Sequence, residues 1–128
     1  MKVLLDTCVV IWATLSPSVL SREAREAIAD EGNVVLVSAA SACEIATKVR
    51  LGRLRGAEKL ERNYIDVMED AGYTLLAIDT ASALRAGRLA ADNRDPFDRM
   101  IVAQALGLDI PVVSPDIQFD GFGMRRIW

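Results

Sequence analysis

The sequence predicts an α/β fold with three layers, α/β/α, in which helices cover both faces of a mainly parallel central sheet. Short apolar segments alternate with longer helical segments along the chain, and this alternation is typical of parallel sheets with helical crossovers. Hydrophobic residues make up 52% of the chain and aromatic residues only 5%, which predicts a core of aliphatic side chains. A length of 128 residues suits one domain, so we expect residues 1–128 to form a single unit.

The first half of the chain is expected to form two strands, each followed by helical segments. The strands are predicted over 2–5 and 34–37, and the helices over 8–15, 21–30 and 38–51. Ser21 is the expected N-cap of the second helix, because its hydroxyl can accept a free backbone N–H. Gly52 is the expected C-terminal cap of the third, because glycine adopts the left-handed conformation without a steric cost.

The second half is expected to complete the sheet with three more strands. Leu60, Tyr64, Val67 and Met68 recur at helical spacing and predict one amphipathic helix over 57–70. Strands are predicted over 73–78, 111–113 and 124–127, and helices over 80–91 and 95–107. Asp95 is the expected N-cap of the last helix, with Pro96 at its favoured first position.

Composition and charge exclude several classes of function. The chain has no histidine and two cysteines, which argues against structural zinc and against a Ser-His-Asp site. A net charge of −3 argues against a general nucleic-acid binder held by bulk electrostatics. No apolar run approaches the roughly 20 residues that span a bilayer, and the N-terminus lacks the shape of a signal peptide. We therefore expect a cytoplasmic protein without a membrane partner.

Acidic residues stand where a parallel sheet would bring them together. Asp6 directly follows the first predicted strand and Asp116 follows the strand at 111–113, so both belong to the carboxyl edge of the sheet, where ligands bind in such folds. Asp98 lies in the first turn of a helix, and Glu44 lies on the helix over 38–51. Crowded carboxylates raise each other's pKa, and a hard divalent cation such as Mg²⁺ or Mn²⁺ relieves their repulsion. The pattern indicates a metal-dependent phosphodiester hydrolase.

Each of these acids also has a purely structural explanation. Asp6 and Asp95 are suited to cap helices, and Asp98 in a first turn suits the helix dipole. Asp116 could be an ordinary loop residue, and Glu44 could form an exposed ion pair with Lys48 four residues later. Cys8 and Cys43 each neighbour a candidate acid, but two small buried residues are the favoured interpretation over redox control.

Four segments occur in an order that resembles PIN-domain ribonucleases, specifically the VapC toxins of type II toxin–antitoxin modules. They are the N-terminal strand with Asp-Thr, "SAASACEIATKVRLGRL", "DPFDRMIVAQA" and "VVSPD". The resemblance runs from Val3 to the C-terminal "GMRRIW" and so covers essentially the whole chain. It implies the PIN variant of the α/β/α fold and Mg²⁺- or Mn²⁺-dependent endoribonuclease activity, in which RNA is cleaved to a 3′-hydroxyl and a 5′-phosphate.

The resemblance also implies site residues and partners. The acidic quartet carries over to Asp6, Glu44, Asp98 and Asp116, with Asp95 as an extra acid of the same metal site. Candidate substrate contacts or supporting side chains are Thr7, Ser41, Arg99 and Ser114, the last standing where the family often has threonine. An arginine-rich stretch (Lys48, Arg50, Arg53, Arg55) is either a phosphate contact or a solvated helix end. The implied partners are RNA, a small VapB-type antitoxin and a second copy in a homodimer.

The sequence departs from the family pattern at three positions. Members of this subgroup often have histidine where Cys8 and Asn93 stand, and tryptophan where Cys43 stands. None of these is an expected metal ligand, so the departures concern substrate contacts.

An aspartyl phosphatase of the haloacid dehalogenase type fits poorly, because it needs a second acid where Cys8 stands. A non-catalytic binding module with the same fold is the alternative that remains. The helices before Asp30 and the stripe from Leu60 to Met68 could hold an antitoxin helix or simply pack into the core.

Overall fold

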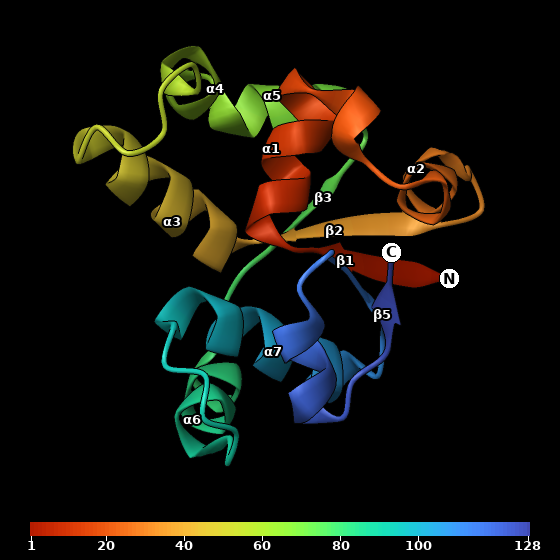
Figure 1. Ribbon diagram of the computed structural model, residues 1–128, viewed down its shortest axis with the longest axis vertical. Coiled ribbons are helices and arrows are strands. Elements are labelled where there is room, and N and C mark those ends of the chain that lie inside the picture. Colours follow the sequence, from red (N-terminus) through yellow and green to blue (C-terminus); the bar gives the residue numbers. More distant parts are fainter.

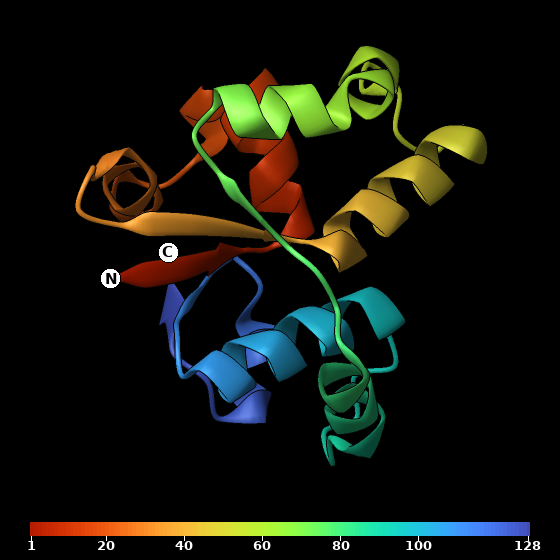
Figure 2. The same ribbon diagram turned by 180° about the vertical axis from the view of Figure 1, so that it is seen from behind.

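A computed structural model describes all of residues 1–128 and contains a five-stranded sheet in the order β3-β2-β1-β4-β5. Every pair of neighbouring strands is parallel. The strands are β1 (Lys2–Leu5), β2 (Val34–Ser38), β3 (Thr74–Leu76), β4 (Val112–Val113) and β5 (Arg126–Ile127). Helices lie on both sides of this sheet (Figures 1 and 2), which confirms the predicted α/β/α layers.

The helices alternate with the strands along the chain. They are α1 (Thr7–Leu15), α2 (Arg22–Ala29), α3 (Ala39–Arg50), α4 (Glu58–Arg62), α5 (Tyr64–Asp70), α6 (Thr80–Arg88) and α7 (Pro96–Leu108), with short 3₁₀ helices η1 (Pro17–Val19) and η2 (Ile117–Phe122). Helices α1, α2 and α5 lie over one face of the sheet, and α6, α7 and η2 lie over the other (Figure 1). None of the helices combines the length and apolar character that crossing a bilayer requires.

The central strand β1 separates two hydrophobic clusters. Val3 and Leu5 pack with side chains of α1, α2, α3, α4 and α5, whereas Leu4 points to the opposite face and packs with α7 and η2. All three residues are fully buried, because β1 has a strand on each side and helices on each face. Such a strand has a continuous apolar sequence, here Val3 to Leu5, and the strand ends at the next polar residue, Asp6.

The expected helix starts are confirmed by their hydrogen bonds. Ser21 accepts a hydrogen bond from the backbone of Ala24 and caps α2, and Ser38 caps α3 through Ala40. Asp95 caps α7, with Pro96 at the first helical position. At the end of α3, Gly52 has a φ of 69°, the left-handed conformation expected of it.

The prediction of one helix over 57–70 is wrong, because the chain forms two helices separated by Asn63. This residue has φ and ψ of −111° and 20°, outside the helical range, and its side-chain amide donates to the carbonyl of Lys59. Asparagine competes for backbone hydrogen bonds in this way and interrupts helices. Leu60 and Met68 are nevertheless buried in the core, so this part of the stripe packs inward rather than forming a free surface.

The third strand is shorter than predicted. The expected span was 73–78, whereas β3 comprises only Thr74–Leu76. It is an edge strand with a hydrogen-bonding partner, β2, on one side only. Pairing ends where β2 itself gives way to α3 at Ser38, which is paired with Leu76.

Candidate active site

Asp6 lies between the end of β1 and the start of α1, and three donors surround its carboxylate. The backbone N–H of Thr7 donates to Oδ1 at 2.7 Å, while the Ser114 hydroxyl and the Cys8 thiol donate to Oδ2 at 2.7 and 3.4 Å. Burial raises the pKa of Asp6, and these hydrogen bonds oppose the rise. Asp6 is therefore a helix cap, as its structural explanation requires, and also a buried acid at the carboxyl edge of the sheet.

A pair of buried hydroxyls joins α1 to α3 beside this acid. Thr7 Oγ1 and Ser41 Oγ lie 2.9 Å apart and form a hydrogen bond in which either hydroxyl can donate. Ser41 lies one turn before Glu44 on α3, so the contact fixes how far α3 stands from Asp6. Thr7 and Ser41 thus lie beside two candidate acids, and their supporting role stays a prediction.

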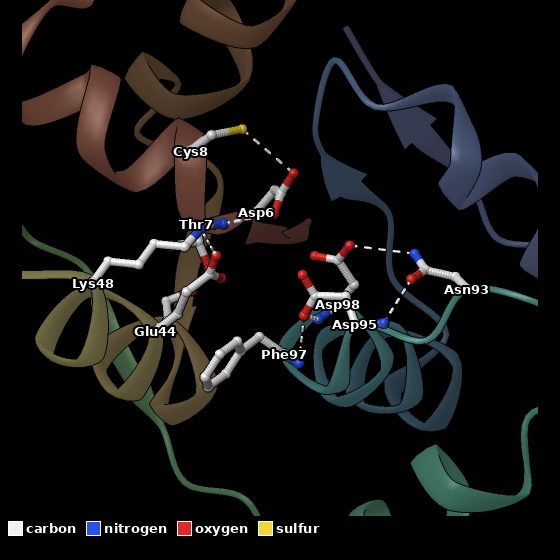
Figure 3. Close-up of polar contacts among 10 residues, drawn as sticks. Asp6, Thr7, Cys8, Glu44, Lys48, Asn93, Asp95, Phe97 and Asp98 are labelled. Atoms are coloured by element: carbon white, nitrogen blue, oxygen red, sulfur yellow. Dashed lines mark hydrogen bonds and ion pairs between the residues drawn. The ribbon is translucent and has the colours of Figure 1, made fainter. Parts of the chain in front are cut away.

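Glu44 is buried, with only 7% of its side chain exposed. Its Oε2 accepts from the Lys48 ammonium, while its Oε1 is buried without a hydrogen-bond partner. The expected ion pair with Lys48 is therefore present, but the idea that it is an exposed surface pair is wrong for the glutamate. Helix α3 is joined to α1 by the Thr7–Ser41 contact, and this places the Glu44 side chain in the interior (Figure 3).

The start of α7 supplies two further acids. Asp95 Oδ1 accepts the backbone N–H groups of Phe97 and Asp98 at 2.9 and 3.3 Å, the expected cap. The amide of Asn93 donates to Asp98 Oδ2 at 3.3 Å, and its carbonyl oxygen accepts the backbone N–H of Asp95 at 2.9 Å. Burial, and then the neighbouring charge of Asp95, raise the pKa of Asp98 to about 7.

Asp6, Glu44 and Asp98 come from three different elements and face the same space between α3 and α7 (Figure 3). The charges of Asp6 and Glu44 both contribute to the raised pKa of Asp98, so the three acids repel one another. No three acidic, cysteine or histidine side chains lie close enough together to hold one metal ion in this conformation. Glu44 is turned toward Lys48, and Asp98 toward Asn93. The all-oxygen donor set and the unpartnered Oε1 of Glu44 fit a hard divalent cation.

Asp116 is linked to Asp6 through Ser114. The Ser114 hydroxyl donates to Asp6 and accepts the backbone N–H of Asp116 at 3.0 Å. The carboxylate of Asp116 caps η2 by accepting the backbone N–H of Gln118 at 2.9 Å. The structure therefore brings Asp116 to the same edge as Asp6, but with one oxygen engaged in its own turn.

Arg99 does not point its guanidinium into the space between the acids. It donates to four backbone carbonyls, those of Ala86, Leu89, Ala91 and Asn93, and so uses four of its five N–H groups. These acceptors belong to the end of α6 and the loop that follows it. A substrate contact of Arg99 has no free donor fork in this structure, because backbone carbonyls occupy the guanidinium.

The sequence interpretation missed the role of Asn93, which it noted only as a departure from a family pattern. The Asn93 side chain donates to the Asp98 carboxylate and accepts from the backbone N–H of Asp95. An asparagine that bonds to the backbone two residues later is a known turn-forming signal. That signal was present in the sequence, but the contact with Asp98 depends on how the loop folds.

Residues 3–123 match the sequence pattern of the family described as PIN domain. The chain belongs to the PIN domain family. No curated protein sequence matches it significantly.

Three solved structures share this PIN fold over nearly the whole chain. A chain of VapBC2 from Rickettsia felis, bound to a DNA fragment from the promoter, superposes with a TM-score of 0.71 at 12% identity, covering 100% of both chains. A chain of DNA-bound VapBC from Salmonella typhimurium gives 0.70 at 21% identity, covering 98% of this chain and 96% of the other. A chain of VapBC-1 from nontypeable Haemophilus influenzae gives 0.69 at 14% identity, with the same coverage. At these identities the likeness concerns the fold.

Two surface features of the PIN domain bear on the remaining expectations. Cys8 and Cys43 are both free thiols, and Cys43 is exposed, so the expectation of two buried cysteines is wrong for it. The arginines at the end of α3 and just after it (Arg50, Arg53, Arg55) are exposed and form no ion pair. Their exposure is compatible both with a solvated helix end and with a phosphate contact.

Proposed function

We propose that this PIN domain is a divalent-metal-dependent endoribonuclease that acts as the toxin of a toxin–antitoxin module. The observation that carries the proposal is that Asp6, Glu44 and Asp98 face one space at the carboxyl edge of the parallel sheet, with the pKa of Asp98 raised to about 7. Buried carboxylates in mutual repulsion are costly to maintain, and such groups cluster at functional sites. Membership of the PIN domain family supports the same assignment.

The residues that would hold the metal are those expected from the sequence. Asp6 and Asp98 are proposed as primary ligands, with Glu44, Asp116 and Asp95 completing the site directly or through water. Oxygen donors of this kind favour Mg²⁺ or Mn²⁺. When bound, the ion supplies Lewis-acid chemistry that stabilises charge on a phosphate and helps water to attack it.

The protein's own groups prepare this site before any ion arrives. Ser114 and the backbone of Thr7 hold the Asp6 carboxylate, and Asn93 holds that of Asp98. A pKa of about 7 leaves Asp98 partly protonated at neutral pH, and an approaching positive charge favours its ionised form. The fold thus orients acids whose repulsion a cation relieves.

The partners follow from the same proposal. RNA is the proposed substrate, and the fold likeness to chains of VapBC assemblies supports a small antitoxin of the VapB type as a protein partner. A homodimer and a cytoplasmic location complete the proposal. The exposed arginines at the end of α3 and just after it (Arg50, Arg53, Arg55) are the proposed contacts for RNA phosphates, because guanidinium groups bind phosphate bidentately.

A non-catalytic binding module with the PIN fold is the second candidate. It is favoured by the absence of three converged acidic side chains and by the Lys48 ammonium that already pairs with Glu44. A protein of this kind would bind RNA or protein without cleaving it.

Cleavage of total RNA separates the two candidates. The purified protein, free of antitoxin, is incubated with total RNA in EDTA or in Mn²⁺, beside an Asp6→Asn variant whose folding is verified by circular dichroism. Discrete fragments that need Mn²⁺ and disappear in the variant are expected of the nuclease. Intact RNA with folded, metal-loaded protein would instead favour the binding module.

A further inference from the structure

Asp6, Glu44 and Asp98 face the space between α3 and α7, and Lys48 is the only positively charged side chain that forms an ion pair with any of them, through Glu44. Its ammonium pairs with Glu44 Oε2, and it also feels the charges of Asp95 and Asp98. No other ion pair reaches Asp6, Glu44 or Asp98. The metal-free protein therefore already contains a cation at this site, and it is part of the chain.

The two partners of this pair differ in how they meet solvent. The Glu44 side chain is 7% exposed, whereas that of Lys48 is 45% exposed. The Lys48 ammonium can therefore move into water once another cation replaces it at Glu44, while Glu44 stays where α3 places it. A buried carboxylate needs a partner, because an unpaired buried charge is expensive.

The other oxygen of Glu44 indicates that the pair is incomplete. Oε1 is buried and has no hydrogen-bond donor. A lysine ammonium approaching from one side leaves this oxygen unsatisfied, whereas an ion or a hydrated ion between the acids could bind it. The carboxylate is thus held by Lys48 but not saturated by it.

We propose that Lys48 is a positioning residue that acts as a resident counter-cation, holding Glu44 in the metal-free protein and leaving it when a divalent cation binds. This inference rests on the proposed metal-dependent function and adds a competition between a side chain and the metal. Because the metal must displace the ammonium, Lys48 weakens metal binding while it stabilises the empty site. Replacing Lys48 by a neutral residue should therefore destabilise the metal-free protein and strengthen metal binding.

Lys48→Met tests both effects, with Arg50→Met as the matched control. Arg50 is an exposed cation two residues later on α3 that makes no ion pair, so its substitution removes the same charge without touching Glu44. Mn²⁺ binding is measured by calorimetry without RNA, and thermal unfolding is followed in EDTA and in Mn²⁺. Lys48→Gln, which keeps a hydrogen-bond donor but no charge, serves if Lys48→Met does not fold.

For Lys48→Met and Lys48→Gln, but not for Arg50→Met, the expected result is a lower melting temperature in EDTA and tighter Mn²⁺ binding, by about threefold or more. Lys48→Arg, which keeps the charge, should retain the weaker binding of the wild-type protein. Equal Mn²⁺ affinities in wild type, Lys48→Met and Arg50→Met would overturn the competition while leaving the nuclease proposal intact. A wild-type protein that binds no Mn²⁺ at all would overturn both.

Discussion

Asp6 and Asp98 differ in how many hydrogen bonds stabilise their ionised form. Asp6 receives three, from Thr7, Cys8 and Ser114, whereas Asp98 receives one long bond from Asn93. Burial is the main cause of the raised pKa in both, and it reaches about 7 for Asp98. At the scale of single residues, Asp98 is therefore the acid whose charge the protein supports least and whose substitution is most informative.

Asp98→Asn is expected to abolish RNA cleavage, with a loss of about 100-fold or more, while the protein remains folded. Asparagine keeps the shape of the side chain but removes the negative charge that a cation requires. Initial rates of cleavage in Mn²⁺ measure the loss, and circular dichroism measures folding. Asp92→Asn, an exposed acid in the preceding loop, is the matched control. Normal cleavage by Asp98→Asn would remove this residue from the site.

The raised pKa of Asp98 predicts how the stability of the metal-free protein varies with pH. Its pKa rises from 3.8 to about 7 on folding, so folding favours the protonated form. The corresponding stabilisation is fully present below about pH 4 and is lost as the pH rises through about 7. Asparagine stays neutral at every pH. The free energy of unfolding of Asp98→Asn should therefore increase relative to that of the wild-type protein as the pH is raised from about 5 to about 8. Chemical unfolding in EDTA at the two pH values measures this, and a constant difference would contradict the raised pKa.

Helices α6 and α7 are joined by the guanidinium of Arg99. One side chain on α7 binds carbonyls at the end of α6 and in the loop that leads to Asn93. Asn93 in turn binds Asp98, so the element contact reaches the candidate site. At the scale of elements, Arg99 fixes the loop between α6 and α7, and Asn93 of that loop positions the Asp98 carboxylate.

Arg99→Lys should destabilise the protein by about 1–3 kcal/mol, because lysine cannot satisfy four partly buried carbonyls arranged around a planar fork. Urea unfolding measures the change, with Arg94→Lys, an exposed arginine of the same loop, as the control. If Arg99 acts on the site only through Asn93, Asn93→Ala should lower cleavage without a comparable loss of stability. Equal stability of Arg99→Lys and wild type would show that the carbonyls find other donors.

The strand order places the acids at one point of the whole molecule. From the central β1 the chain continues to β2 and β3 on one side, and later to β4 and β5 on the other. Such a reversal opens a crevice at the carboxyl ends of the strands. Asp6 follows β1 and Asp116 follows the adjacent β4, and α3 and α7 bring Glu44 and Asp98 from the two sides.

A divalent cation that joins these elements should raise the melting temperature of the whole protein. Binding to the folded state alone contributes about 2.7 kcal/mol when the free ion is at 100 times its dissociation constant. Thermal unfolding in increasing Mn²⁺ measures the shift, which Asp6→Asn should reduce. No shift at millimolar Mn²⁺ in the wild-type protein would count against the ion site.

The order of the elements and most helix caps were predictable from the sequence because they depend on neighbouring residues. Apolar runs predict strands, and the caps at Ser21, Ser38 and Asp95 contact backbone within three residues. The break between the two helices in 57–70 also depends on a local contact, in which the Asn63 side-chain amide donates to the Lys59 carbonyl. The chain can either form this contact or continue as one helix, and packing decides between the two.

What the sequence by itself determined is the parallel α/β architecture and the list of acids, since both follow from local apolar patterns and residue chemistry. Only the tertiary structure decided that Glu44 is buried, so that its predicted pair with Lys48 is not a surface pair, and that the Arg99 guanidinium binds carbonyls. These facts depend on contacts between α3, α6 and α7 and their neighbours. Burial and partner choice are set by where whole elements meet, and residue type leaves them open.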